Sequence, residues 1–123
     1  MTLERITQSR RAAESRGRSS EALATLLLRL KLYRILGRRV RTHAGEIDLV
    51  ARSPSGILCF IEVKARSDHL SALESVTPRQ RERIARAAQL FVSGKTSLVR
   101  KGMRFDIITV APVPRHFRDA WRP

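Results

Sequence analysis

The stretch that decides the fold is GEIDLV at residues 45–50, followed after a short insert by ILCFIEVK at residues 57–64. Both runs are rich in β-branched and aromatic residues. The insert between them contains the proline and the glycine that are typical of turns. The two runs therefore predict a β-hairpin.

The register of this hairpin brings two acids together. If the hairpin is symmetric about Ser55, Asp48 lies opposite Glu62 and Glu46 lies opposite Lys64. Because side chains alternate along a strand, Asp48, Glu62 and Lys64 are expected on one face. Directly opposed like charges are destabilising, and a divalent cation would compensate, because Mg²⁺ is commonly held by one or two carboxylates and substrate phosphates. The alternative is a solvated face on which both acids point into water.

The overall charge predicts a polyanionic partner. The chain has 123 residues and a formal charge of +14, from 25 Lys and Arg against 11 Asp and Glu. That length suits a single domain, and that charge favours nucleic acid, which is the expected partner. The first residues lack the apolar core of a signal peptide and no apolar run approaches membrane-spanning length, so we expect a cytoplasmic protein that does not bind membranes.

Cysteine and histidine chemistry contributes little to the expected function. Cys59 is the only cysteine and stands among apolar neighbours, which predicts a core thiol. The three histidines, His43, His69 and His116, do not have zinc-ligand spacing.

The N-terminal part of the chain is expected to contain a basic arm and a helix. Residues 1–16 form the arm, either mobile or helical on a polyanion, and residues 17–123 form a single domain. The helix is expected from Ser19 or Ser20 to about Lys31. Its core face should carry four leucines at helical spacing: Leu23, Leu26, Leu27 and Leu30.

Two charged features flank the hairpin. Glu21 lies in the first turn of the expected helix, where the helix macrodipole favours an acid. After the helix, a strand within residues 32–40 leads into three arginines, Arg38, Arg39 and Arg41. Such a charge run forms either a solvated edge or, beside the acid pair, a contact with a phosphate backbone.

The second half predicts a loop at 65–76, a helix and a strand. The helix begins after Thr77 and ends at Ser93, with a core face of Ile84, Ala88 and Phe91. The strand covers 104–110, where Asp106 is either a structural charge partner or a ligand. Residues 115–121 are expected to be a tail whose Phe117 and Trp121 dock at helical spacing. This order predicts an α/β or α+β fold with a mixed central sheet flanked by helices.

The acid pair has a family resemblance. Asp48, a gap of 13 residues and then Glu62-Val63-Lys64 resembles the PD-(D/E)XK nuclease superfamily. The longer strings GEIDLVA at 45–51 and FIEVKAR at 60–66 resemble the signature of the YraN family of predicted endonucleases. The similarity continues in Gly17-x-x-x-Glu21-x-x-Ala24, in RFD at 104–106 and in DAW at 119–121, so that it covers about residues 17 to 121.

This resemblance implies a restriction-endonuclease-like core and a nuclease site. Glu21 becomes an expected active-site acid, because related Holliday-junction resolvases carry a glutamate on the first helix near the metal. Those resolvases are dimers, which makes a homodimer an expectation by analogy. The superfamily's proline is replaced by Ile47. Gln80 stands where a lysine is frequent and, together with Arg66 and Arg79, completes the expected nucleic-acid contacts.

The leading hypothesis is metal-dependent endonucleolytic hydrolysis of phosphodiester bonds, in DNA before RNA. Asp48 and Glu62, with Glu21 and the Val63 carbonyl, are expected to hold one or two Mg²⁺ or Mn²⁺ ions. Lys64 is expected to orient the attacking water or to stabilise negative charge, unless it forms a plain salt bridge with Glu46. Two alternatives remain, namely a non-catalytic nucleic-acid-binding module on a nuclease-like fold and a basic accessory of a ribonucleoprotein.

Overall fold

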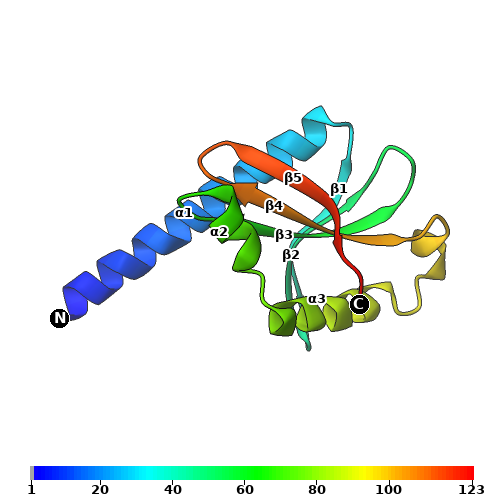
Figure 1. The fold of residues 1–123 in the computed structure, drawn as a ribbon. Coiled ribbons are helices and arrows are strands. Elements are labelled where there is room, and N and C mark those ends of the chain that lie inside the picture. The colour runs from blue at the N-terminus through cyan, green and yellow to red at the C-terminus, as the bar shows by residue number, and fades with distance from the viewer. Residues whose placement is uncertain (1) are drawn as a thin grey trace.

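The protein is built around one five-stranded sheet (Figure 1). The computed structural model describes residues 2–123, and the side chains at positions 6, 9, 10 and 12–16 lie outside that description. One pair of neighbouring strands is parallel, and the other three pairs are antiparallel. The elements in chain order are α1 (Leu3–Leu30), β1 (Arg34–Thr42), β2 (Gly45–Arg52), β3 (Leu58–Ala65), α2 (His69–Glu74), α3 (Pro78–Val92), the 3₁₀ turn η1 (Thr96–Val99), β4 (Met103–Val110) and β5 (Pro114–Trp121).

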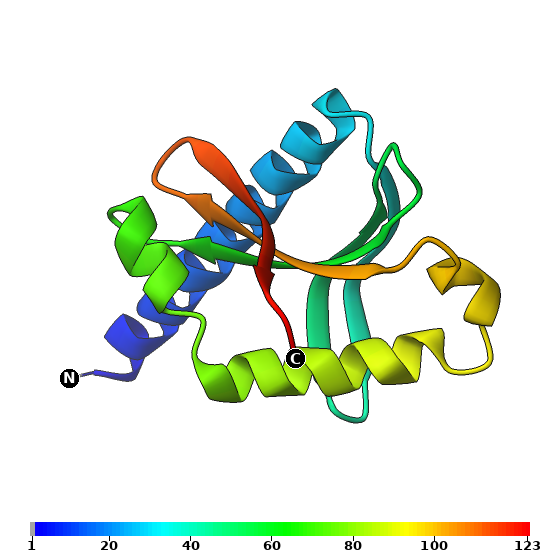
Figure 2. The same ribbon diagram turned by 45° about the vertical axis from the view of Figure 1, so that its right-hand side comes forward.

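Helices cover both faces of this sheet. The strands lie in the order β1-β2-β3-β4-β5, with β3 and β4 parallel. α1 crosses one face and α3 lies against the other, as the two views show (Figures 1 and 2). Alternate residues of one strand serve the two cores: Val50 packs in the α3 cluster, whereas Leu49 and Ala51 pack in the α1 cluster. The predicted mixed α/β fold is therefore confirmed.

The central hairpin has the predicted register, but its ladder is shorter. Leu49 pairs with Ile61 and Val50 pairs with Phe60, as symmetry about Ser55 requires. The ladder ends at the pair of Leu49 with Ile61 and does not include Asp48 and Glu62. Asp48 and Glu62 therefore lie where the two strands separate, and not within a regular ladder.

Helix α1 begins earlier than expected. It starts at Leu3, where the Thr2 hydroxyl accepts a hydrogen bond from the Arg5 N–H, and not at Ser19 or Ser20. Its first turns extend beyond the sheet (Figure 1). The boundary at residue 16 and the mobility of the arm stay predictions. Met1 and the side chains of Arg10 and Arg16, which belong to that arm, lie outside the described residues.

The predicted core face of α1 was wrong. Leu23, Leu26 and Leu30 are exposed, with 73% of Leu30 accessible, whereas Ala24 and Leu28 are fully buried against the sheet. The small Ala24 lets the helix approach the strands closely, and the leucines are left on the flank of the helix. The periodicity identified the helix correctly, but four leucines on one face are not sufficient to show which face is buried.

Two further segments differ from the expectation. The predicted loop contains the short helix α2, capped by Asp68, whose carboxylate accepts a hydrogen bond from the Ser71 N–H. The predicted tail is the edge strand β5, paired with β4. A spacing of four residues, as between Phe117 and Trp121, fits one helical turn but also one face of a strand, since four is even.

Helix α3 agrees with the expectation. Thr77 caps it, and Gln80 completes a capping box with the Thr77 backbone. Ile84 and Ala88 are buried, and Phe91 packs against the same cluster. Within residues 2–123, none of the helices has the length and apolarity needed to cross a membrane.

Candidate active site

The separation of β2 and β3 forms a notch that contains Asp48. Where the ladder stops, the Asp48 carboxylate takes the place of a backbone acceptor: Val63 donates its N–H to Asp48 Oδ2 at 2.8 Å. A side chain thus satisfies a backbone group that the missing strand pair leaves free. This bond holds the Asp48 carboxylate next to the β3 segment that carries Glu62 and Lys64.

Glu62 lies in the same notch and is nearly buried. Only 13% of its side chain is exposed, and Lys64 Nζ is 3.6 Å from Glu62 Oε1. Burial, followed by the charge of the neighbouring Asp48, raises the pKa of Glu62 to about 9, and Lys64 offsets only part of this rise. At neutral pH the carboxyl therefore keeps a proton in the absence of another positive charge. The rival pairing of Lys64 with Glu46 does not form, because Glu46 lies 3.6 Å from Arg41 instead.

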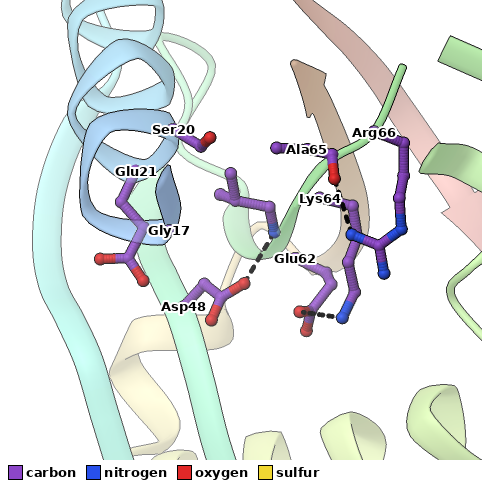
Figure 3. Close-up of a pocket in the computed structure, with 9 residues that line it drawn as sticks. Gly17, Ser20, Glu21, Asp48, Glu62, Lys64, Ala65 and Arg66 are labelled. Carbon is purple, nitrogen blue, oxygen red and sulfur yellow. Dashed lines mark hydrogen bonds and ion pairs between the residues drawn. The ribbon is translucent and has the colours of Figure 1, made fainter. Parts of the chain in front are cut away.

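These groups open onto a cavity of about 440 Å³ between α1 and the notch. Figure 3 shows Asp48, Glu62 and Lys64 on the strands and Glu21 on the helix beside them. The cavity is lined by Gly17, Ser20, Glu21, Asp48, Glu62, Val63, Lys64, Ala65 and Arg66. Three acids and two cations therefore face one space.

Glu21 lies at the edge of this space and has a partner of its own. Arg39 Nε donates to Glu21 Oε2 at 2.7 Å, and this contact raises the pKa of Arg39. In the β1–β2 register Arg39 lies across from Asp48, with an unusual positive φ of 50°. Arg39 thus connects α1 to the strands beside the acid pair. The role of Glu21 as a metal ligand stays a prediction.

The donor set fits a hard divalent cation. Asp48 and Glu62 supply carboxylate oxygens, which Mg²⁺ and Mn²⁺ prefer, and Val63 lines the same cavity. Across the described residues, no three Asp, Glu, His or Cys side chains come close enough to form a metal site by themselves. Two carboxylates are nonetheless the usual number for Mg²⁺, which keeps waters and substrate phosphates as its other ligands. Glu62 is nearly buried beside Asp48 with only Lys64 as a cationic partner, so additional positive charge would be stabilised here.

A second buried acid lies elsewhere, on β4. Asp106 is fully buried and accepts four hydrogen bonds, two from the Arg104 guanidinium at 2.8 Å, one from His116 Nε2 at 2.7 Å and one from the Asp119 N–H at 2.9 Å. Lys31 Nζ is 2.6 Å from His116 Nδ1. Since an ammonium only donates, His116 Nδ1 accepts this hydrogen bond. His116 Nε2 therefore carries the proton and donates the hydrogen bond to Asp106. Asp106 is therefore a structural charge partner.

Sequence comparison places the chain in a family. The model of the uncharacterised protein family UPF0102 matches residues 20–110. The chain belongs to UPF0102. This is the YraN family, which confirms the resemblance seen in the strings around Asp48 and Glu62.

The relatives of the chain match almost its whole length. A UPF0102 protein of Maricaulis maris is 50% identical over 120 residues, which cover 96% of this chain and 94% of the relative. A UPF0102 protein of Paramagnetospirillum magneticum is 46% identical, with 94% of each chain covered. A UPF0102 protein of Agrobacterium fabrum is 44% identical, with 98% of this chain and 100% of the relative covered. The names of these relatives state no activity.

The residues predicted to contact nucleic acid lie on different parts of the structure. Arg66 lines the cavity itself, whereas Arg38 and Arg41 are exposed on the edge strand β1. Arg79 and Gln80 lie in the first turn of α3, and Gln80 lines a smaller cavity of about 220 Å³. That cavity is also lined by Glu62, so Glu62 borders both cavities, whereas Asp48 borders only the larger one. The contacts themselves stay predictions.

The sequence interpretation missed the contribution of the helix backbone to this site. Gly17 and Ser20 line the main cavity, although they were considered only as part of a family motif and as a helix cap. A signal was present in the sequence, because Gly17, Ser20, Glu21 and Ala24 have the spacing of one helix face. Since Ala24 is buried on the sheet, the other three must face the strands.

Proposed function

We propose that this chain is a metal-dependent nuclease that hydrolyses phosphodiester bonds in nucleic acid, with DNA as the expected substrate. The observation that carries the proposal is the meeting of Asp48, Glu62 and Lys64 at the notch between β2 and β3, beside a cavity in a protein of charge +14. A purely cationic binding protein has no reason to place two acids side by side at the bottom of such a cavity.

The cation is part of the proposal. Asp48 and Glu62 would hold Mg²⁺ or Mn²⁺, with the Val63 carbonyl next to them and Glu21 at the edge of the site. When bound, the ion would supply Lewis acidity toward a phosphate oxygen and a more acidic water. The proton that Glu62 keeps because of burial and of Asp48 must leave when the ion binds.

The other residues would act on the substrate. The Lys64 ammonium is within reach of the same space and would stabilise the negative charge that develops on the phosphoryl oxygens. Because only 18% of the Lys64 side chain is exposed, water screens that charge weakly. Arg66, on the rim of the cavity, would contact a neighbouring phosphate.

Three finer expectations belong to this proposal. Asp48 and Glu62 are the predicted ligands, and Lys64 is the predicted catalytic cation. A cytoplasmic location suits a nuclease that acts on cellular nucleic acid. A homodimer stays a prediction, which light scattering of the purified chain tests directly. The exposed leucines of α1 offer apolar surface of the kind that interfaces use.

The experiment is a panel of single-stranded, flapped, branched and duplex DNA and RNA, incubated with Mg²⁺, Mn²⁺ or EDTA. The wild-type chain is compared with Glu62→Gln, which removes the charge at the site. Glu82→Gln is the matched control, because Glu82 is exposed on α3 and does not line either of the two cavities that Glu62 lines. We expect cleavage by the wild type and by Glu82→Gln in the presence of either cation, and none by Glu62→Gln.

The opposite results would identify a different protein. Cleavage that survives EDTA, or that Glu62→Gln retains in full, contradicts the proposal. Salt-dependent binding that survives EDTA, without products from any substrate, would assign the chain to the alternative class of non-catalytic nucleic-acid-binding modules.

A further inference from the structure

The inward face of α1 loses side-chain volume toward the cavity. Leu28, Ala24, Ser20 and Gly17 follow one another along this face at spacings of four, four and three residues. Leu28 and Ala24 are fully buried against the sheet, and Ser20 is almost so. The series ends with no side chain at Gly17, which lines the cavity opposite the acid pair. This face of the helix is thus tightly packed at Leu28 and Ala24 and has no side chain at Gly17.

Gly17 is not required by the helix or by its packing. Glycine is the least favourable helix residue after proline, because it loses most backbone entropy on folding. The Gly17 backbone does not have the positive φ that would favour glycine. Apart from the two chain neighbours and the backbone of the same helix, no atom of the described residues lies within 4 Å of the position that a Cβ would take. An alanine would therefore fit this structure and would suit the helix better.

The space below Gly17 has the size and lining for part of one nucleic-acid strand. Its volume of about 440 Å³ lies in the range of pockets that enclose a small ligand, which is too little for a duplex. Lys64 and Arg66 face it from the strand side, and the acid pair lies at its bottom. α1 closes the opposite side through Gly17, Ser20 and Glu21.

We propose that the slot beneath Gly17 binds one unpaired strand of nucleic acid, with its sugar-phosphate backbone passing between the α1 backbone and the acid pair. This inference rests on the proposed function and adds the substrate class. The chain would act on strands that are single or can leave their partner, such as loops, flaps and junctions, and poorly on continuous duplex. Glycine suits this position because a methyl group would occupy the path of the strand.

The cations of α1 suggest where the strand leaves the slot. Arg18 is exposed next to Gly17, and Arg11, seven residues earlier, lies on the same face of the helix. Arg29 lies on that face as well, but eleven residues beyond Arg18, at the end of the helix that packs on the sheet. Arg18 and Arg29 are therefore a matched pair, since both are exposed cations of α1 and they differ in their distance from the slot.

The test measures binding, stability and cleavage in the full chain. Affinities for single-stranded and duplex DNA and for single-stranded RNA are measured in EDTA, so that the result does not depend on a cation. The variants are Gly17→Ala and Gly17→Leu in the slot, with Ala22→Leu as the control, because Ala22 is exposed on α1 and does not line the cavity. Arg18→Ala and Arg29→Ala form the second pair.

Gly17→Ala is expected to raise the melting temperature and yet to weaken single-strand binding. Gly17→Leu should weaken it by about tenfold or more, whereas Ala22→Leu should leave it unchanged. Arg18→Ala should lower the salt slope of binding by about 0.7, the value for one phosphate of a single strand, and Arg29→Ala should not. Binding by Gly17→Leu equal to the wild type, or a wild type that prefers duplex, overturns the inference.

The two proposals can fail separately. If the wild type cuts in a metal-dependent manner and Gly17→Leu cuts and binds as well, the slot is wrong and the nuclease stands. If Gly17→Leu loses binding but the wild type yields no products with any cation, the slot stands and the nuclease is wrong. A wild type that binds neither DNA nor RNA overturns both.

Discussion

Asp106 on β4 is fully buried and Glu62 on β3 is nearly so, and the surroundings of these two acids are opposite. Asp106 on β4 accepts hydrogen bonds from Arg104, from His116 and from the Asp119 N–H. Burial alone would raise its pKa, but the hydrogen bonds from His116 and Arg104 outweigh burial and leave the pKa lowered. Glu62 on β3 has a second acid beside it, and only a lysine 3.6 Å away to offset it.

This difference distinguishes a structural acid from a functional one. Buried charge is costly unless it is paired and hydrogen-bonded, and Asp106 meets that condition within the chain. Glu62 does not, because burial and Asp48 raise its pKa to about 9. The protein does not supply enough positive charge to neutralise Asp48 and Glu62. Such a carboxyl pair is a candidate site for a cationic ligand.

The largest effect is expected on stability. Asp106→Asn leaves the Arg104 guanidinium without its carboxylate, and should lower the free energy of unfolding by about 3–5 kcal/mol. Glu62→Gln removes a carboxyl that is costly to bury beside Asp48, and should leave the free energy of unfolding unchanged or raise it. Urea denaturation of both variants measures this. Equal losses would show that the two acids are equally structural.

The next effect is expected on catalysis. Lys64→Met removes the ammonium beside Glu62 but keeps a side chain of similar length, so cleavage should fall by about 10²–10³ while nucleic-acid binding stays close to the wild type. Lys101→Met is the control, because Lys101 is exposed and does not line the cavity of the acid pair. Single-turnover rates on the best substrate of the panel measure it. Wild-type rates in Lys64→Met would remove Lys64 from the mechanism.

The third effect couples the cation to pH. Glu62 ionises near 4.5 when unfolded and near 9 when folded, so between these values the folded chain holds a proton that the unfolded chain lacks. Stability therefore falls as pH rises through this window. Mg²⁺ or Mn²⁺ displaces that proton, so its stabilisation should grow with pH and reach about 2.7 kcal/mol at one hundred times the dissociation constant.

Thermal unfolding from pH 6 to pH 9, with and without the cation, measures this coupling. Glu62→Gln should lose both the fall of stability with pH and the response to the cation. A cation effect of the same size at every pH, or one that Glu62→Gln retains, would place the ion elsewhere in the protein.

The smallest effect concerns Glu21, which has one cationic partner, the exposed Arg39. Its partner Arg39 is 47% exposed, so water screens the ion pair, and Arg39→Ala should lower stability only slightly. Because Arg39 has a φ of 50°, Arg39→Gly relieves backbone strain and should be more stable than Arg39→Ala by up to about 1 kcal/mol. Differential scanning calorimetry compares the two variants. An alanine variant at least as stable as the glycine variant would show that the strain is absent.

Much of the fold follows from local patterns in the sequence. The hairpin register was predictable, because the turn residues and the alternation of 45–50 with 57–64 leave one symmetric pairing. The capping of α3 by Thr77 was predictable for the same reason, since a cap is a contact over three residues. The meeting of Asp48 with Glu62 follows from that register, which is why the centre of the site was accessible from the sequence.

The parts that were missed depend on contacts between distant residues. Which face of α1 is buried is decided by its close approach to the sheet at Ala24, and the leucine pattern contains no information on that approach. The partners of Asp106 are Arg104 on β4 and His116 and Asp119 on β5. Lys31 of α1 in turn contacts His116. The notch itself was also missed, because regular alternation predicts a ladder that continues and does not predict where two strands separate.

The most direct test of the central claim is to locate the cation. Crystals of the chain soaked in Mn²⁺ at about pH 8 and measured for anomalous scattering should show one peak or more between the carboxylates of Asp48 and Glu62, and crystals of Glu62→Gln should not. Asp106 should have no peak in either crystal, because its oxygens are already occupied by protein donors. An ordered Asp48 and Glu62 pair without manganese, or a peak of equal height in Glu62→Gln, would contradict the account.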